Sequence, residues 1–159
     1  MIKTLADALA KQGYDKLTPV QSEVSKEEFE ISDLLVSAQT GSGKTVGFGI
    51  AIAPTILKDK DNFERASAPL ALIIAPTREL AMQVKRELTW LYSMAGATIA
   101  SCVGGMDMRD ERRSLERGSH IVVATPGRLR DHIRRGSINL SQIKAVVLDE
   151  ADEMLDLGF

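Results

Sequence analysis

The sequence is poor in cysteine and contains no long apolar run. Its 159 residues include a single cysteine, Cys102, so an internal disulfide is excluded and a reducing compartment is expected. No apolar stretch approaches the roughly 18 residues that a membrane-spanning helix needs. Asp7 and Lys11 interrupt the first residues, which argues against a signal peptide. These absences predict a cytoplasmic protein with no membrane partner.

The sequence also lacks a strong net charge, since its formal charge at pH 7 is −2. The total charge therefore gives no general attraction to nucleic acid. Residues 109–135 are a local exception, with eight arginines against four acidic residues. We expect most of these arginines to lie on solvated helix faces. His120 and His132 lack the spacing of metal ligands and are interpreted as structural or exposed residues, and Cys102 as a small buried one.

Short apolar runs recur along the chain and alternate with stretches of helical periodicity. The runs are Leu34–Ala38, Leu70–Ala75, Thr98–Val103, His120–Ala124 and Lys144–Leu148. The clearest helix lies at Glu79–Met94, where large aliphatic residues recur at three- and four-residue spacing. This alternation predicts an α/β fold with a mostly parallel sheet. Because the runs are apolar almost throughout, helices are expected on both faces of the sheet.

A glycine-rich segment, Ala38-Gln39-Thr40-Gly41-Ser42-Gly43-Lys44-Thr45, follows the first predicted strand. A strand, a glycine-rich turn and a helix form the layout of a phosphate-binding loop. Gly41 and Gly43 permit the tight path that turns backbone N–H groups toward phosphate, and a helix starting near Gly43 adds its positive end. Lys44 is expected to bridge the β- and γ-phosphates, and the Thr45 hydroxyl to bind Mg²⁺. The alternative is a glycine-rich turn that serves only as a connector.

Two acidic residues, Asp149 and Glu150, directly follow the last apolar run. The carboxyl ends of strands in an open α/β sheet are where ligands bind. Asp149 can hold Mg²⁺, in part through water, and Glu150 can orient or deprotonate an attacking water. The alternative is an acidic cluster that faces solvent. The prediction requires Lys44 and Asp149 to meet around one metal–triphosphate.

The sequence resembles the DEAD-box RNA helicase family in several segments that occur in the family order. They are Gly13-Tyr14, Thr18-Pro19-Val20-Gln21, residues 38–45 with the family's alanine at position 38, Ala75-Pro76-Thr77-Arg78-Glu79-Leu80, Gly104-Gly105, Thr125-Pro126-Gly127-Arg128 and Asp149-Glu150-Ala151-Asp152. The resemblance covers essentially the whole chain. It implies an N-terminal RecA-like domain that uses ATP and Mg²⁺.

The resemblance also implies where the nucleotide binds. The implied contacts are Tyr14, Gln21, Gln39, Thr40, Gly41, Ser42, Gly43, Lys44 and Thr45. The Gln21 carboxamide, with one acceptor and two donors, matches the N6/N7 edge of adenine and favours ATP over GTP. The sequence departs from the family in two places, because no aromatic residue precedes Tyr14 to stack on adenine and Leu17 replaces a common proline.

A second set of residues is implied to bind the RNA backbone. The set comprises Pro76, Thr77, Arg78, Gly105, Thr125 and Arg128. Helix N-termini and arginines bind phosphates, and a glycine pair lets a ribose approach the backbone closely. Because none of these groups is suited to reading base edges, binding is expected to be independent of RNA sequence. Trp90, a possible stacking platform, is interpreted as a packing residue.

Residues 1–159 are expected to be part of a longer protein. The Ser-Ala-Thr segment and the second RecA-like domain of the family do not occur in the sequence. The family places the Ser-Ala-Thr strand beside the strands that carry Lys44 and Asp149, so unpaired backbone groups are expected in the middle of the sheet. Without the arginine fingers of the second domain, this chain alone is expected to hydrolyse ATP negligibly.

The sequence leaves two alternatives to an ATP-dependent RNA helicase. One is a different phosphate-loop ATPase, such as a transport or remodelling motor, which would not need Gln21 or the Thr125–Arg128 turn. The other is a non-enzymatic RNA-binding or scaffolding module that has kept the fold and lost catalysis. The presence of Lys44, Asp149 and Glu150 argues against such a loss.

Overall fold

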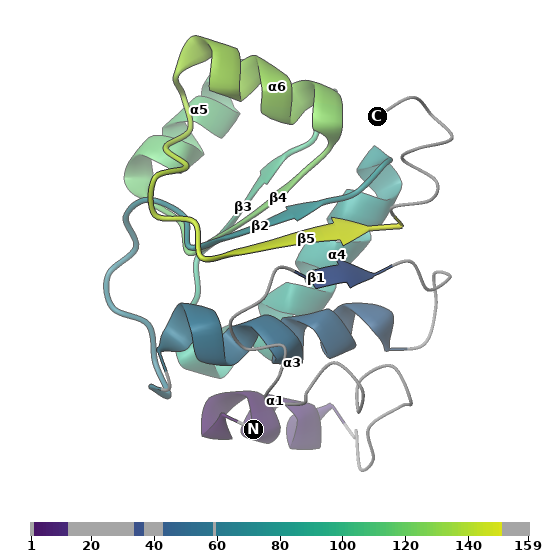
Figure 1. The fold of residues 1–159 in the computed structure, drawn as a ribbon, viewed down its shortest axis with the longest axis vertical. Helices are drawn as coiled ribbons and strands as arrows, with labels where there is room; N and C mark the ends of the chain where they lie inside the picture. Colours follow the sequence, from purple (N-terminus) through teal and green to yellow (C-terminus); the bar gives the residue numbers. More distant parts are fainter. Residues whose placement is uncertain (1, 13–33, 37–42, 59, 151–159) are drawn as a thin grey trace.

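The computed structural model describes residues 2–12, 34–36, 43–58 and 60–150, which form one parallel sheet flanked by helices (Figure 1). The strands are β1 (Leu34–Val36), β2 (Ala71–Ile74), β3 (Ile99–Cys102), β4 (Ile121–Ala124) and β5 (Ala145–Asp149). Their order is β1-β5-β2-β4-β3, and each pairing is parallel. The predicted α/β class and the five predicted strands are confirmed, with Asp149 as the last residue of β5.

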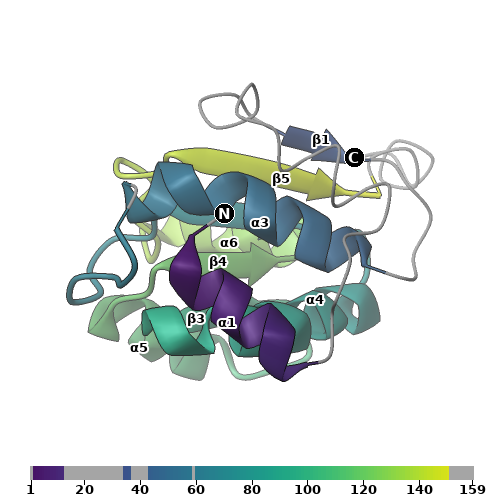
Figure 2. The ribbon, with the colours of Figure 1, turned by 90° about the horizontal axis from the view of Figure 1, so that it is seen from below.

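Helices cover both faces of the sheet, as the continuous apolar strands predicted (Figures 1 and 2). They are α1 (Lys3–Lys11), α3 (Lys44–Leu57), α4 (Arg78–Leu91), the short 3₁₀ helix η2 (Ser93–Ala95), α5 (Met108–Arg117) and α6 (Pro126–Arg135). The helices α1, α3 and α4 pack on one face, and α5 and α6 pack on the other. None of the helices in these ranges is long and apolar enough to cross a bilayer.

Alternate residues of the central strands supply the two cores. In β2, Ala71 and Ile73 face the α3–α4 layer, whereas Leu72 belongs to the core beneath α5 and α6. Strand β4 follows the same rule, with Val123 in the first core and Val122 in the second. Successive side chains of a strand point to opposite faces, and helices cover both faces of these central strands. Consecutive residues of β2 and β4 must therefore all be apolar.

The strand β1 pairs directly with β5, and this corrects one expectation. Leu34 is in register with Val147, and Val36 with Asp149. The sequence predicted unpaired backbone groups between these strands, where the family's Ser-Ala-Thr strand would lie. An unpaired buried N–H or C=O group is costly, so the backbone groups of β1 and β5 form hydrogen bonds with each other instead.

The helix predicted at residues 79–94 is divided in the structure. Helix α4 ends at Leu91, and the η2 turn continues to Gly96, whose φ of +74° suits a glycine at a helix end. Tyr92 lies at the division, fully buried, and its hydroxyl donates a hydrogen bond of 2.5 Å to the Gly49 carbonyl of α3. This bond joins α3 and α4 beneath the sheet.

Candidate functional site

The candidate site lies at the carboxyl edge of the sheet, where α3 begins. Gly43 precedes the helix with φ +83°, a left-handed conformation that glycine adopts at no steric cost. Lys44 and Thr45 follow in the first turn, and both are buried. The sequence prediction that a helix begins beside Gly43 is therefore confirmed.

The ammonium of Lys44 contacts both acidic residues at the end of β5. Its Nζ lies 2.6 Å from Asp149 Oδ1 and 3.3 Å from Glu150 Oε1. The Asp149 side chain is fully shielded from solvent, and that of Glu150 is 14% exposed. Residues more than a hundred positions apart thus meet at one edge, as the sequence predicted. The solvent-facing alternative for the acidic cluster is excluded for Asp149 and Glu150.

Burial raises the pKa of the Asp149 carboxyl, and the nearby Lys44 ammonium opposes this rise. Asp149 Oδ1 lies 2.6 Å from the Lys44 ammonium in a site closed to solvent, so the two groups form a buried ion pair. A buried carboxylate beside a second acid fits a hard cation such as Mg²⁺, which prefers carboxylate and hydroxyl ligands. The buried Thr45 adds a hydroxyl in the same turn as Lys44.

Glu150 has a left-handed backbone with φ +53°, which is uncommon for a residue with a side chain. Such strain costs about 1–3 kcal/mol and is concentrated at functional sites. Here the unusual conformation accompanies a carboxylate that reaches back to Lys44.

A second group of predicted residues surrounds two consecutive glycines after β3. Gly104 and Gly105 have φ values of +73° and +68°. A Cβ atom on Gly105 would overlap the Arg78 guanidinium and lie 3.3 Å from its Cζ. A Cβ on Gly104 would lie 3.9 Å from Arg128 Nε. The glycine pair therefore separates two arginines that both belong to the predicted RNA-binding set.

Helices position these two arginines from opposite sides. Thr77 caps α4, since its hydroxyl accepts a hydrogen bond of 3.2 Å from the Leu80 N–H, and exposed Arg78 opens the helix. Pro76, which precedes them, is buried. Thr125 lies at the N-cap of α6 with Pro126 at its first turn, and Arg128 follows.

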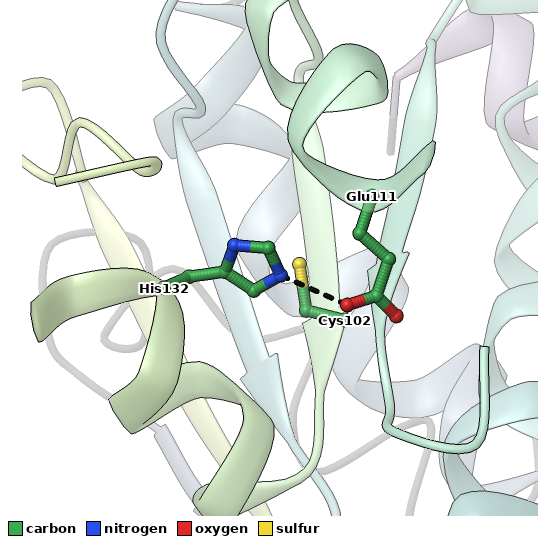
Figure 3. A group of neighbouring side chains, drawn as sticks. All are labelled: Cys102, Glu111 and His132. Carbon is green, nitrogen blue, oxygen red and sulfur yellow. Dashed lines mark hydrogen bonds and ion pairs between the residues drawn. The ribbon is translucent and has the colours of Figure 1, made fainter. Parts of the chain in front are cut away.

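Arg128 contacts Glu111, which lies in a buried polar cluster between α5, α6 and β3. Figure 3 shows Cys102, Glu111 and His132 of this cluster. Glu111 Oε1 accepts hydrogen bonds from Arg128 Nη1 at 3.0 Å and from His132 Nε2 at 2.8 Å. Its Oε2 accepts a bond of 3.0 Å from the Val103 N–H. Burial and the Glu111 charge raise the pKa of the Cys102 thiol, which faces the cluster, to about 12.

Sequence reasoning missed Glu111, although one signal was available. Glu111 precedes Leu115 by four residues, so the two side chains share one face of α5. Leu115 belongs to the core, and Glu111 is 4% exposed, whereas the other acids of residues 109–135 are exposed. Cys102 is buried, as interpreted, and His132, which was interpreted as structural or exposed, is fully buried.

The remaining predictions concern exposed arginines, two residues that pack in the interior and residues outside the described ranges. The other seven arginines of residues 109–135 are exposed, as expected for solvated helix faces. Trp90 packs against the core, and buried His120 stacks on Phe63 with ring centroids 4.3 Å apart. The predicted nucleotide contacts outside the described residues are Tyr14, Gln21, Gln39, Thr40, Gly41 and Ser42, and Ala151 and Asp152 also lie outside.

A parallel five-stranded sheet with a lysine and two acids at its carboxyl edge defines a RecA-like domain. The chain belongs to the DEAD/DEAH box helicase family, whose model matches residues 18–159. It is 41% identical to the "DEAD-box ATP-dependent RNA helicase CshA" of Geobacillus kaustophilus, covering 96% of this chain and 31% of that protein. It is 42% identical to the "ATP-dependent rRNA helicase RRP3" of Debaryomyces hansenii, covering 100% of this chain and 32% of that protein.

Solved structures support the same fold. The yeast DEAD-box splicing factor Prp28 matches with a TM-score of 0.85 and 33% identity, over 99% of this chain and 38% of that one. A hypothetical ATP-dependent RNA helicase from Sulfolobus tokodaii also gives a TM-score of 0.85 at 33% identity, over 100% of this chain and 44% of that one. The chain therefore spans about a third of the curated relatives it matches and under half of these solved chains.

Proposed function

We propose that this chain binds ATP with Mg²⁺ at the Lys44 site and single-stranded RNA at the glycine pair. It would serve as the nucleotide-binding half of an ATP-dependent RNA helicase that opens short duplexes. The contact of 2.6 Å between Lys44 and Asp149 carries the proposal, because it brings a phosphate-binding lysine and a metal-binding acid to one point. Family membership supports the same reading.

In this proposal the residues of the site divide the work of phosphoryl transfer. Lys44 binds the β- and γ-phosphates, while Thr45 and Asp149 hold Mg²⁺. Bound Mg²⁺ supplies positive charge that offsets the charge of the phosphates. Glu150 orients the attacking water and accepts its proton. The predicted contacts with adenine, including Gln21, and with the phosphates from Gln39 to Gly43 complete the nucleotide site.

The proposed RNA site recognises the phosphate and sugar backbone rather than bases. Arg78 and Arg128 flank the glycine pair, and the N-termini of α4 and α6 begin beside them. Arginine side chains and helix N-termini both favour phosphate. Pro76, Thr77, Gly105 and Thr125 complete the predicted surface, which offers RNA binding with little sequence preference.

The whole helicase activity further requires a second RecA-like domain, which we propose as the partner of this one. Arginine fingers from such a domain are worth about 10³–10⁵ in the rate of hydrolysis. The chain alone is therefore expected to bind its ligands and to turn over ATP very slowly. A cytoplasmic location fits a protein with one buried cysteine.

The nucleotide proposal can be tested by measuring binding of a fluorescent ATP analogue with Mg²⁺ to the 159-residue chain. The change Lys44→Ala is expected to lower affinity at least about a hundredfold, because it removes a buried ammonium from the phosphate site. Lys85→Ala serves as the control, since this lysine contacts Ser101 on the α4 side of β3 instead. Equal affinity of the Lys44→Ala variant and the wild type would refute the site.

A further inference from the structure

Glu111 differs from the other charged residues of α5 in both burial and bonding. Helix α5 is rich in exposed arginines and acids, yet the Glu111 side chain is 4% exposed and accepts three hydrogen bonds. A buried carboxylate is costly unless it is paired and bonded, so this one is held in a single position. Its partners come from two elements, the end of β3 and helix α6.

These partners adjoin the glycine pair of the proposed RNA surface. Val103, which donates its N–H to Glu111 Oε2, immediately precedes Gly104. Arg128, which donates to Oε1, lies 3.9 Å from the position of a Cβ on the same glycine. One carboxylate thus fixes the glycine pair relative to the arginine that would bind phosphate.

We propose that Glu111 is a positioning residue for RNA binding, which holds Arg128 and the glycine pair in the geometry that receives the RNA backbone. The inference rests on the RNA site proposed above. A guanidinium has five N–H donors in a rigid plane. Nη1 donates to Glu111, and Nη2 donates to the Met106 carbonyl at 3.3 Å, which leaves N–H groups for a phosphate while Arg128 stays anchored. An anchored arginine loses less side-chain entropy when it binds.

His132 is a second bonding partner of the Glu111 carboxylate that holds Arg128. It is fully buried, and its Nε2 lies 2.8 Å from the same Glu111 oxygen that receives Arg128. Since an ionised carboxylate only accepts hydrogen bonds, this geometry requires the proton on Nε2. The imidazole therefore donates to the same carboxylate that anchors Arg128 (Figure 3).

The same cluster offers three potential metal ligands, and the geometry favours positioning over metal binding. Donor atoms of Cys102, Glu111 and His132 lie within 4.8 Å of one another. A cation among them would bind the carboxylate whose Oε1 already accepts bonds from His132 and from the positively charged Arg128 guanidinium. Two positive charges on one buried carboxylate oppose each other.

A double-mutant cycle on RNA affinity tests the proposal with the 159-residue chain. Binding of a fluorescently labelled oligouridine is measured for the wild type, Glu111→Gln, Arg128→Ala and the double variant. Glu111→Gln keeps the side-chain size and is expected to weaken RNA binding about three- to tenfold, because Arg128 loses a charged partner. With Arg128→Ala already present, the same change is expected to have less than about a twofold effect.

Glu116→Gln is the matched control. It removes one negative charge from the same helix, but this side chain is 66% exposed and pairs only weakly with Arg112 at 3.8 Å. Charge alone predicts that loss of either acid leaves RNA affinity unchanged or raises it. Positioning predicts a loss for Glu111→Gln only, so the sign of the change distinguishes the two.

Several results would overturn the inference. Unchanged RNA binding by Glu111→Gln would mean that Arg128 does not need this carboxylate, and tighter binding would mean that Glu111 competes with phosphate. An equal loss in both Arg128 backgrounds would mean a purely structural role. One zinc ion retained per purified chain would assign the cluster to metal. If Glu111→Gln loses its helical circular dichroism, His132→Leu replaces it, with an expected loss of about twofold that again requires Arg128. Absence of RNA binding by the wild type, or full binding by Arg128→Ala, would refute the RNA site itself.

Discussion

Three glycines with nearly the same backbone conformation but different surroundings allow the RNA surface to be tested. Gly96, Gly104 and Gly105 have φ values of +74°, +73° and +68°. An alanine at any of them must adopt the left-handed region, which costs about 1–2 kcal/mol. For a domain of this size, that cost lowers Tm by roughly 2–8 °C. The three alanine variants should therefore lose similar stability.

Their effects on RNA binding should differ, because the space around each Cβ differs. A Cβ on Gly96 meets nothing within 4 Å, and one on Gly104 makes an ordinary contact of 3.9 Å with Arg128. A Cβ on Gly105 overlaps the guanidinium of Arg78, which must move away. A charged hydrogen bond is worth about 1.5–3 kcal/mol, so displacing Arg78 should weaken RNA binding at least about tenfold.

The assay combines thermal unfolding with fluorescence anisotropy of a labelled single-stranded RNA at two salt concentrations. Gly105→Ala should bind weakly and show a shallower salt dependence, because one phosphate contact is lost. Gly96→Ala should bind like the wild type, and Gly104→Ala should lie close to it. If Gly104→Ala and Gly105→Ala lost affinity equally, backbone strain rather than Arg78 would explain the result, and the reasoning would fail.

Other predictions concern the core and the buried thiol. Gly49→Ala should lower the free energy of unfolding in urea by about 1–3 kcal/mol, since its Cβ would lie 2.6 Å from Leu91 Cδ2; an unchanged midpoint would contradict this packing. Tyr92→Phe should cost about 1 kcal/mol in the same assay through loss of the bond to Gly49. Because burial raises the pKa of the Cys102 thiol to about 12 and shields it from solvent, iodoacetamide at pH 8 should label it only as fast as the chain unfolds. Rapid labelling of folded protein would show that the thiol is accessible.

Much of the fold could be predicted because local pattern and final burial agree. The predicted strands were apolar almost throughout, and the central strands β2 and β4 lie between two helical layers, so pattern and environment coincide there. The meeting of Lys44 with Asp149 was also predictable, since both follow strands of one parallel sheet.

The pairing of β1 with β5 was not predictable from residue pattern. Strand order depends on which backbone edges meet, and apolar runs carry no information about their neighbours. The burial of Glu111 was not predicted for a related reason, because an acidic residue among arginines normally forms an ion pair on the surface. Its burial follows from the partners that Val103, Arg128 and His132 provide, and these lie outside helix α5.

The ion pair at the end of β5 has a consequence for which form of nucleotide can enter. With Lys44 already neutralised by two acids, a bare triphosphate would meet their repulsion and would have to break a buried contact. On the function proposed above, Asp149 would exchange the ammonium for the divalent ion that accompanies the nucleotide, and Lys44 would turn toward phosphate. The site would thereby discriminate against the metal-free ligand, so chelation alone should empty it.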